Sequence, residues 1–195
     1  MINVFIYDSR KNKEYDEKLF PESLRFYLKN NKKEEISYIA YSMLIDILKE
    51  YYKLEKIDFD FTNKPILTTD EVNFNISHSG NFIAIGVSCQ NEVGIDIESL
   101  ERDISDNLYN RALHPQEIIS KPETCDKKTH FLMCHTRKEA FLKLRGTGFN
   151  VRPNSLNTYY LDHLPIYNLE KEKLILCVAG ASDGRVSINK SLELF

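Results

Sequence analysis

The sequence predicts an α+β fold in which short strands and amphipathic helices occur in both halves of the chain. Short runs rich in Ile, Val and Phe are separated by turn residues, which is typical of strands. Two longer segments repeat their apolar residues at helical spacing. The composition changes near residues 98–105, and 195 residues suffice for one large domain or two small ones. We therefore expect an N-terminal α/β half over residues 1–100 and a C-terminal α/β half over residues 101–195.

The N-terminal half begins with a predicted strand at residues 2–7, which are rich in β-favouring side chains. Residues 56–61 alternate apolar and acidic side chains, which predicts a short half-buried strand before the turn at residues 63–65. Between these strands, residues 31–52 form a predicted long helix, because their apolar residues lie on one helical stripe: Ile36, Ile39, Ala40, Met43, Leu44, Ile47 and Leu48.

The middle of the chain is a run of predicted strands. Residues 74–77, 82–88 and 93–98 are apolar and are separated by the turn-like segments 79–81 and 90–92. Because short turns join strands that run in opposite directions, we expect a three-stranded antiparallel meander.

The C-terminal half opens with a polar segment, residues 100–120, that contains short helical patches. Residues 128–145 form a strong predicted helix, which ends at Gly146 because glycine favours helix C-termini. The remaining predicted strands lie at residues 158–160, 174–179 and 186–188.

Composition excludes several classes of protein. Hydrophobic residues make up 42% and charged residues 28% of the chain, so a wholly disordered protein is excluded. The net charge of −3 argues against a surface that coats nucleic acid. No stretch reaches the roughly 18 apolar residues of a membrane helix, and the apolar N-terminus precedes its charged residues, the reverse of a secretory signal. We expect a cytoplasmic protein with reduced cysteines and no membrane or nucleic-acid partner.

The first polar cluster is Asn75-Ile-Ser-His-Ser-Gly80, at the end of a predicted strand. Its donors lie at Ser77, His78 and Ser79, beside a glycine that lets a ligand approach the backbone. Such a group of donors suits phosphate oxygens. A polar turn with a surface histidine and no ligand would contain the same residues. Taken alone, this motif favours such a turn over a phosphate-binding site.

The second cluster is Gly94-Ile-Asp-Ile-Glu98. Because side chains alternate along a strand, Asp96 and Glu98 share one face, while Ile95 and Ile97 share the other. Two carboxylates on one face of an apolar strand require a compensating cation. Mg²⁺ is one solution, since it binds through carboxylates and substrate phosphates. The alternative is a strand with one solvated face.

The third cluster lies on the predicted helix 128–145. His135, Glu139 and Lys143 are spaced four residues apart and share one helical face. A surface ion pair between Glu139 and Lys143 is the common explanation for this spacing. The alternatives are a third metal-binding carboxylate with a lysine that faces a phosphate, or a metal pair of His135 and Glu139.

Taken together and in this order, three segments resemble a known family. Phe74-Asn-Ile-Ser-His-Ser-Gly80, Val93-Gly-Ile-Asp-Ile-Glu98 and Thr136-Arg-Lys-Glu-Ala-Phe-Leu-Lys143 are similar to motifs of the 4′-phosphopantetheinyl transferases of the surfactin-synthetase-activating type. Asn63-Lys-Pro65 before these motifs and Gly146-Thr-Gly-Phe149 after them also fit that family.

The resemblance implies an activity and a fold. The family transfers the phosphopantetheine arm of coenzyme A to a serine of an apo acyl or peptidyl carrier protein and releases adenosine 3′,5′-bisphosphate. Its members are monomers of two similar α/β halves with pseudo-twofold symmetry, and coenzyme A lies in the cleft between the halves. The pathway stays open between fatty-acid, polyketide and nonribosomal peptide biosynthesis.

The resemblance also implies a metal site and catalytic residues. Asp96, Glu98 and Glu139 would hold Mg²⁺ against the coenzyme pyrophosphate, with Mn²⁺ as the alternative ion. Lys143 would face the phosphates. The carrier serine needs a base, and we expect Glu139 to accept its proton, so Glu139 and Lys143 are the expected catalytic residues.

Further residues are expected to contact coenzyme A. By the matched motifs, Lys64, Ser77 and His78 would contact the coenzyme, and Lys138 would assist Lys143 at the phosphates. The 3′-phosphate of the coenzyme needs a cationic pocket, and the candidates lie before and at the start of the predicted long helix: Arg25, Lys29, Lys32 and Lys33. A solvated run of charges explains these four residues equally well.

The chain departs from the family pattern at three positions. His135 stands where the family usually has a Trp, and Tyr38 and Ser42 stand where it usually has an Arg and a Gly. The first change affects packing beside the metal site, and the others affect the nucleotide contacts of the N-terminal half. The carboxylates and Lys143 are retained.

Two other functions fit the same residues. Clustered carboxylates with a lysine also serve Mg²⁺-dependent phosphodiesterases and nucleases. A family member that binds coenzyme A or a carrier protein without catalysing transfer would also retain these motifs.

Overall fold

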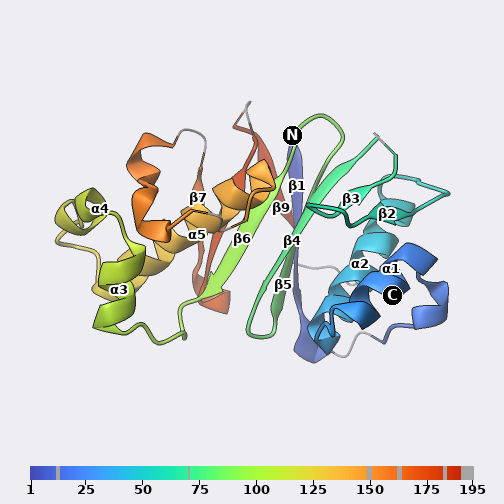
Figure 1. Cartoon of the computed structure of the whole chain (residues 1–195), viewed down its shortest axis with the longest axis horizontal. Helices are drawn as coiled ribbons and strands as arrows, with labels where there is room; N and C mark the ends of the chain where they lie inside the picture. The colour runs from blue at the N-terminus through green and yellow to red at the C-terminus, as the bar shows by residue number, and fades with distance from the viewer. Residues whose placement is uncertain (12–13, 70, 149–150, 162–163, 182–183, 190–195) are drawn as a thin grey trace.

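The structure is a computed structural model that describes residues 1–11, 14–69, 71–148, 151–161, 164–181 and 184–189. Its strands form a four-stranded sheet in the order β4-β5-β1-β9, a three-stranded sheet in the order β6-β8-β7, and a small two-stranded sheet of β2 and β3. Figure 1 shows the two larger sheets side by side in the middle of the molecule, with helices on either side. The mixed α and β fold expected from the sequence is confirmed.

The first sheet consists of β1 (Ile2–Asp8), β4 (Asn73–Ser79), β5 (Phe82–Ser88) and β9 (Val186–Asn189). Strand β5 pairs antiparallel with both β4 and β1, while β9 pairs parallel with β1. Two helices cover one face of this sheet, α1 (Glu22–Asn30) and α2 (Glu35–Glu50). The two-stranded sheet, β2 (Phe59–Asp60) and β3 (Ile66–Leu67), lies beside them.

The second sheet consists of β6 (Gly94–Ser99), β7 (Ile166–Leu169) and β8 (Leu174–Ala179), all paired antiparallel. The long helix α5 (Lys127–Arg145) packs on it, and α3 (Asp106–Ala112) and α4 (Pro115–Ile119) lie at its far end. Short 3₁₀ turns complete the fold at Ser9–Lys11, Glu17–Leu19, Pro153–Ser155, Thr158–Tyr160 and Glu170–Glu172.

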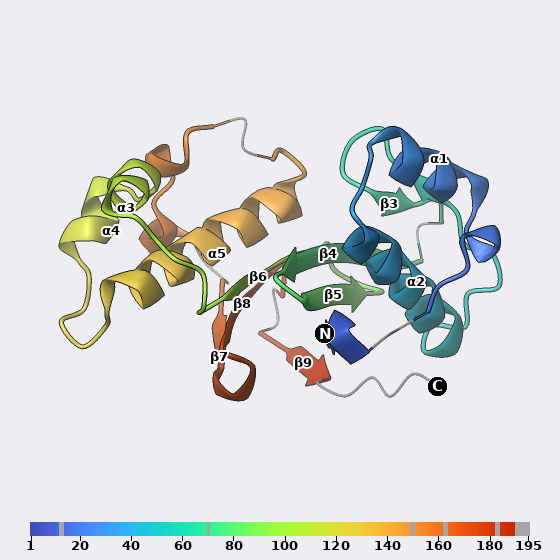
Figure 2. The same cartoon turned by 90° about the horizontal axis from the view of Figure 1, so that it is seen from below.

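The two larger sheets share an apolar core. Alternate residues of β1 point toward α2, whereas Ile2, Val4 and Ile6 pack against Ile95 and Ile97 of β6. The molecule is therefore layered as helices, first sheet, second sheet and α5, as seen from below in Figure 2. Burial on both faces explains why β5 and β8 are nearly continuous apolar runs.

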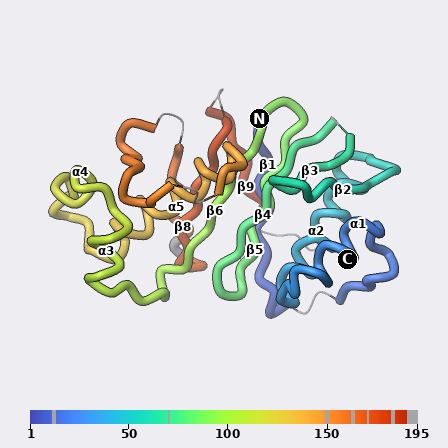
Figure 3. Tube along the Cα trace, viewed as in Figure 1, coloured from blue at the N-terminus to red at the C-terminus, as the bar shows by residue number. Residues whose placement is uncertain are grey.

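Strands β4 and β6 run side by side in the same direction, but they are not joined by a backbone ladder. Side-chain oxygens on alternate residues of β4 accept hydrogen bonds from the backbone of β6. Asn75 Oδ1 lies 3.0 Å from the nitrogen of Ile95, and Ser79 Oγ lies 3.1 Å from the nitrogen of Ser99. Ser77 Oγ lies between them, 3.4 Å from the nitrogen of Ile97. We call this row of contacts the seam; the tube in Figure 3 shows the two strands diverging from it into separate sheets.

Several predicted elements are confirmed. These are the strand at residues 2–7, the hairpin of β4 and β5, the short helices within 100–120, helix α5, and strands β8 and β9. Gly146 follows α5 with φ at 65°, the left-handed conformation expected of a glycine after a helix.

Other predictions are wrong. The three-stranded meander does not form, because β6 pairs with β8 instead of β5. The helix expected from residue 31 begins at Glu35, since α1 ends at Asn30 and Lys32 has a φ of 46°. The strand expected at 158–160 is a 3₁₀ turn. Strand β6 lies before residue 100 but pairs in the second sheet, and β9 lies after it but pairs in the first, so the domain division at residue 100 stays a prediction.

No helix within the part of the chain that the structure describes has the length and apolar character needed to span a membrane.

The contact between β6 and α5 depends on the missing side chain of Gly94. A Cβ atom there would lie 2.1 Å from the carbonyl oxygen of Ala140 and 2.5 Å from the nitrogen of Leu144. Both are backbone atoms of α5, so a rotamer change cannot relieve the clash. We predict that Gly94→Ala lowers the free energy of unfolding by about 3 kcal/mol, because the helix must move.

Gly80→Ala is the matched control. Gly80 has a positive φ, of 56°, which Gly94 does not have, and nothing lies within 4 Å of its missing Cβ. This change should therefore cost only about 1 kcal/mol of backbone strain. Urea denaturation of both variants measures the difference; equal losses would contradict the close packing of β6 on α5.

Candidate active site

The acidic side chains of β6 point toward α5. Gly94 on this strand contacts the backbone of α5, and by alternation Asp96 and Glu98 face the same way. Ile95 and Ile97 face the opposite way, into the core between the sheets. The face predicted for the two carboxylates is therefore the face that the structure gives them, and both carboxylates are buried.

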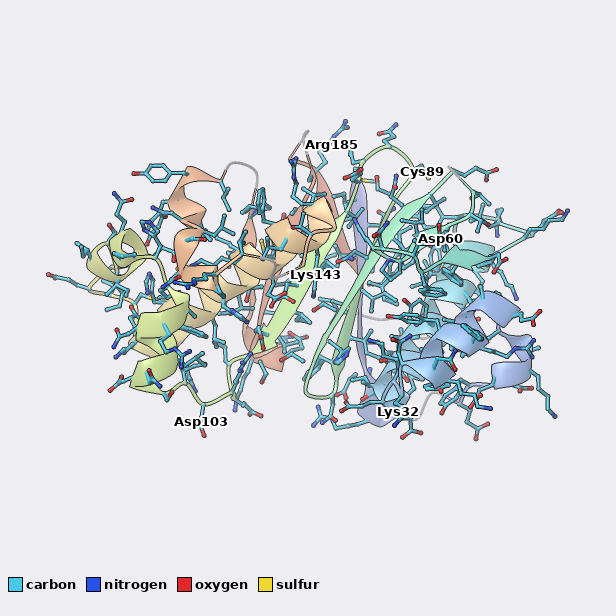
Figure 4. The ribbon with its side chains drawn as sticks, viewed as in Figure 1. Lys32, Asp60, Cys89, Asp103, Lys143 and Arg185 are labelled. Atoms are coloured by element: carbon cyan, nitrogen blue, oxygen red, sulfur yellow. The ribbon has the colours of Figure 1, made fainter. Side chains whose placement is uncertain are left out.

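Asp96 is held by one oxygen. Its Oδ1 accepts hydrogen bonds from Ser77 Oγ at 2.8 Å and from Lys143 Nζ at 2.7 Å. Lys143 Nζ also donates to Ser77 Oγ at 2.9 Å, which closes a triangle across β4, β6 and α5. The other oxygen, Oδ2, is buried and has no hydrogen-bond partner. Figure 4 labels Lys143 between α5 and the two strands, near the middle of the molecule.

Glu98 is held by both oxygens. Its Oε2 accepts a hydrogen bond from Ser79 Oγ at 2.9 Å, and its Oε1 lies 2.5 Å from Nη1 of Arg102. His135 Nε2 approaches the same Oε1 to 3.6 Å. Burial, followed by the charge of Asp96, raises the pKa of Glu98 despite these donors.

Glu139 completes the acidic group from the side of the helix. It lies one helical turn from both His135 and Lys143, and its Oε1 is 3.9 Å from His135 Nε2. Burial raises its pKa to about 7, and the charges of Asp96 and Glu98 add to this shift. His135 Nε2 therefore lies close to an oxygen of both Glu98 and Glu139, while the shared metal site of the three carboxylates stays a prediction.

The acidic group fits a divalent cation by its chemistry. In the structure its oxygens are engaged by Lys143, Arg102 and two serines, and within the described ranges no three acidic, His or Cys side chains are placed so that they could hold a metal ion together. Asp96 Oδ2 is nevertheless a buried carboxylate oxygen without a partner, which is costly unless a cation or donor occupies the space beside it. Hard oxygen ligands of this kind suit Mg²⁺ or Mn²⁺.

A cavity of about 470 Å³ opens beside Lys143. Tyr27, Lys33 and Tyr41 line it from α1, α2 and the turn between them, and Lys143 and Gly146 line it from the end of α5 and the residue that follows it. The remaining lining residues are Ser37, Asn63, Lys64, Pro65, Phe74, Asn75, Ile76, Leu142, Thr147 and Gly148. The cavity therefore joins the residues of four of the five segments that carry the family resemblance.

Comparison with known proteins agrees with this geometry. Residues 92–176 match the 4′-phosphopantetheinyl transferase superfamily. The matched segment contains Asp96, Glu98, Glu139 and Lys143. The superfamily expected from the sequence motifs is confirmed for this segment.

Individual relatives carry the same name. The chain is 33% identical over 137 residues to the 4′-phosphopantetheinyl transferase HetI of Nostoc sp., covering 64% of this chain and 56% of HetI. It is 31% identical over 110 residues to the 4′-phosphopantetheinyl transferase AcpT of Escherichia coli, covering 54% of this chain and 55% of AcpT. The match to AcpT of Salmonella typhimurium is 36% over 78 residues, 37% of this chain and 40% of that protein. The chain thus spans less than two thirds of each of these relatives.

The expected coenzyme contacts lie at different places in the structure. Ser77 lies between Asp96 and Lys143. Lys64 lines the cavity, where its Nζ donates to the carbonyl oxygen of Val93 at 2.8 Å and burial lowers its pKa. His78 lies on β4, where partial burial, followed by the charge of Lys143, lowers its pKa.

Of the four basic candidates for the 3′-phosphate, Lys33 lines the cavity, and its Nζ lies 5.5 Å from the centre of the Tyr27 ring. Arg25, Lys29 and Lys32 are exposed and are not lining residues. The expected placement of Lys32 and Lys33 at a helix start is wrong, because they lie in the turn between α1 and α2. Phe149, which also fits the family pattern, lies outside the described residues.

The role expected of Lys138 is contradicted by its position. Its side chain is fully buried, and Nζ lies 2.7 Å from Glu117 Oε2. Nζ also donates to the carbonyl oxygens of Ala112 and Pro153, at 2.9 and 3.0 Å. All of its donors are thus used inside the second half, which removes Lys138 from the phosphate site. The physical reason is helical geometry, since a residue next to Glu139 points about 100° away from it.

Three residues have contacts that the sequence patterns do not predict. Ser79 belongs to the expected group of phosphate donors, yet its hydroxyl donates to Glu98. Arg102 follows Glu98 by four residues in the turn after β6. This spacing predicts a contact between two side chains only within a helix. Glu117, fully buried, anchors Lys138 and accepts hydrogen bonds from Thr158 at 2.9 and 2.7 Å.

The buried pair of Glu117 and Lys138 should dominate the acid stability of the second half. Burial alone raises the pKa of Glu117, but hydrogen bonds from Lys138, Thr158 and His114 outweigh it and lower the pKa below its usual value. The ionised Glu117 carboxylate therefore stabilises the fold fully at pH values above the pKa of a glutamate in the unfolded chain, about 4.3. This stabilisation is lost as the pH falls through the lower pKa that Glu117 has in the folded protein.

We predict that Glu117→Gln lowers the free energy of unfolding by about 3–5 kcal/mol at neutral pH, because the ammonium of Lys138 loses its charged partner. The difference from the unmodified protein should narrow on acidification below about pH 4. Denaturant melts from pH 7 to pH 3 measure it; a gap that stays constant over this range would contradict the ionic role of Glu117.

Proposed function

We propose that the protein is a 4′-phosphopantetheinyl transferase of the surfactin-synthetase-activating type. It would transfer the phosphopantetheine arm of coenzyme A to a serine of an apo acyl or peptidyl carrier protein. The observation that carries the proposal is the ion pair of Lys143 with Asp96, because Lys143 also lines the cavity. Glu98 and Glu139 each have an oxygen close to His135 Nε2, at 3.6 and 3.9 Å. The superfamily match of residues 92–176 supports the same chemistry.

Asp96, Glu98 and Glu139 would hold the divalent cation, Mg²⁺ or Mn²⁺, beside the coenzyme pyrophosphate. The bound cation would supply positive charge that stabilises the oxygens of the transferring and leaving phosphates. Lys143 lies 2.7 Å from Asp96 and also lines the cavity, so its ammonium can turn from the carboxylate to a phosphate oxygen. Ser77 forms hydrogen bonds with both Asp96 and Lys143 and so fixes the position of one relative to the other.

The transfer itself is a displacement at phosphorus. The carrier serine oxygen forms a bond to the β-phosphorus of coenzyme A, and the bond from that phosphorus to the bridging oxygen breaks. The leaving group is adenosine 3′,5′-bisphosphate. Glu139 would accept the serine proton, because its carboxylate lies one helical turn from Lys143 on the same face of α5. Positioning and electrostatic stabilisation supply the rest of the rate enhancement.

The family also gives the proposal its cellular context. A monomer with two similar halves, working in the cytoplasm, would serve carrier proteins of fatty-acid, polyketide or nonribosomal peptide biosynthesis. The layered arrangement of two sheets, each with a long helix on its outer face, supports the two-half description.

The activity is tested by incubating the protein with coenzyme A, Mg²⁺ and a panel of apo carrier proteins. We predict that one carrier gains the mass of phosphopantetheine on a serine, as read by intact-protein mass spectrometry. Glu139→Gln should abolish the gain without unfolding the protein, since the amide has the same shape as the carboxylic acid. Near-normal turnover in that variant would remove Glu139 from the mechanism.

The same experiment separates the other two functions. Binding of coenzyme A without transfer to any carrier would indicate a non-catalytic family member. Cleavage of a nucleic acid or a simple phosphodiester with Mg²⁺ and no carrier would indicate a phosphodiesterase.

The 3′-phosphate contact of Lys33 has its own test. We predict that Lys33→Ala weakens coenzyme A binding about tenfold or more, because a charge-assisted hydrogen bond contributes roughly 1.5–3 kcal/mol. Binding of 3′-dephospho-coenzyme A should not change. Arg25→Ala, an exposed neighbour outside the cavity, is the matched control and should affect neither ligand. Isothermal titration calorimetry measures the affinities of the unmodified protein and both variants for the two ligands, and equal losses for both ligands in Lys33→Ala would place Lys33 elsewhere on the coenzyme.

A further inference from the structure

The seam between β4 and β6 connects the fold to the acidic group. Asn75, Ser77 and Ser79 occupy alternate positions on β4, so their side chains all point toward β6. Each accepts a hydrogen bond from a backbone nitrogen of β6. The two serines have a hydroxyl hydrogen left to donate, and both donate it to a carboxylate, Asp96 for Ser77 and Glu98 for Ser79.

The single donor hydrogen of Ser79 is committed by these contacts. Its oxygen accepts from the nitrogen of Ser99 at 3.1 Å, and its one hydrogen goes to Glu98 Oε2 at 2.9 Å. A hydroxyl has a single donor hydrogen. Ser79 is therefore occupied within the protein and does not serve as the phosphate donor that its place in the sequence motif suggested.

Glu98 has a second partner of a different kind. Arg102 approaches Oε1 from the turn after β6, and its side chain is 42% exposed. A long, partly solvated side chain can leave, whereas the hydroxyl of Ser79 is tied to the backbone of Ser99. Ser79 is thus the fixed contact of Glu98, and it holds one carboxylate oxygen at β4 while Arg102 holds the other at the turn.

We propose that Ser79 is a positioning residue that sets the orientation of Glu98 for divalent-cation binding. This inference rests on the proposed function only in assigning the cation to the acidic group. Without the hydroxyl, Glu98 would follow Arg102 away from β4, and the cation would lose one of its ligands. Residues that orient metal ligands in this way commonly change metal affinity 10–100-fold when they are removed.

The test is direct binding of Mn²⁺ to the purified full chain, measured by electron paramagnetic resonance without coenzyme or carrier. Ser79→Ala should weaken Mn²⁺ binding about tenfold or more, and Ser79→Thr, which keeps the hydroxyl, should restore it to within about threefold. Asn75→Ala is the matched control. It removes the same kind of seam contact, from the nitrogen of Ile95, while leaving both carboxylates with their donors, so its Mn²⁺ affinity should stay within about threefold of the unmodified protein.

A second readout separates positioning from general loosening of the seam. In the transfer assay, Ser79→Ala should need more metal for half-maximal rate but recover most of its turnover when the metal is saturating. Thermal melts of the two alanine variants should show similar losses of stability, since each leaves one backbone nitrogen of β6 without an acceptor.

Three results would overturn the inference. They are unchanged Mn²⁺ affinity in Ser79→Ala, equal losses of affinity in Ser79→Ala and Asn75→Ala, and absence of Mn²⁺ binding to the unmodified protein. The proposed transfer is judged separately by the mass gained on the carrier, so its failure is distinguishable from the failure of this inference.

Discussion

The site depends on how β6 is attached to β4. A strand that continued the first sheet would have its backbone groups paired on both sides, and its side chains would lie above and below that sheet. Here side-chain oxygens replace the ladder on one side, which leaves β6 free to turn its other edge to β8. The same attachment places the hydroxyls of β4 against the carboxylates of β6. Sheet separation and carboxylate placement therefore have one structural cause.

Electrostatics divides the buried charges into two kinds. Glu117 and Lys138 form a closed pair whose hydrogen bonds are all satisfied by protein groups, so the pair contributes to stability and offers nothing to a ligand. The group around Asp96 has excess negative charge, and burial together with the neighbouring carboxylates raises the pKa values of Glu98 and Glu139. An incomplete balance of charge next to a cavity is typical of functional sites. A bound cation and the phosphates of a ligand would balance the charges of the group around Asp96.

Local patterns in the sequence predicted the elements that carry the site. The alternation at residues 94–98 gave the face of the carboxylates, and the four-residue spacing of His135, Glu139 and Lys143 gave the face of the helix. Strand pairing was mispredicted, because β6 pairs with β8, which follows it by about eighty residues, and no turn signal reports so distant a partner. The break between α1 and α2 was missed because no Gly or Pro marks it; it depends on the positive φ of Lys32. Lys138 was misassigned from the motif although its helical angle already pointed away from Glu139.

Gly94 has a consequence for attempts to alter this protein. The main chain of α5 rests directly on the main chain of β6 there, so the spacing between the helix and the strand is set by peptide atoms. Evolution or protein engineering can exchange the groups that project into the gap, yet neither can widen the gap by trimming a side chain, because none separates the two elements at that point. A changed selectivity for an ion or a substrate would therefore have to come from replacing the side chains that project from β6 and α5.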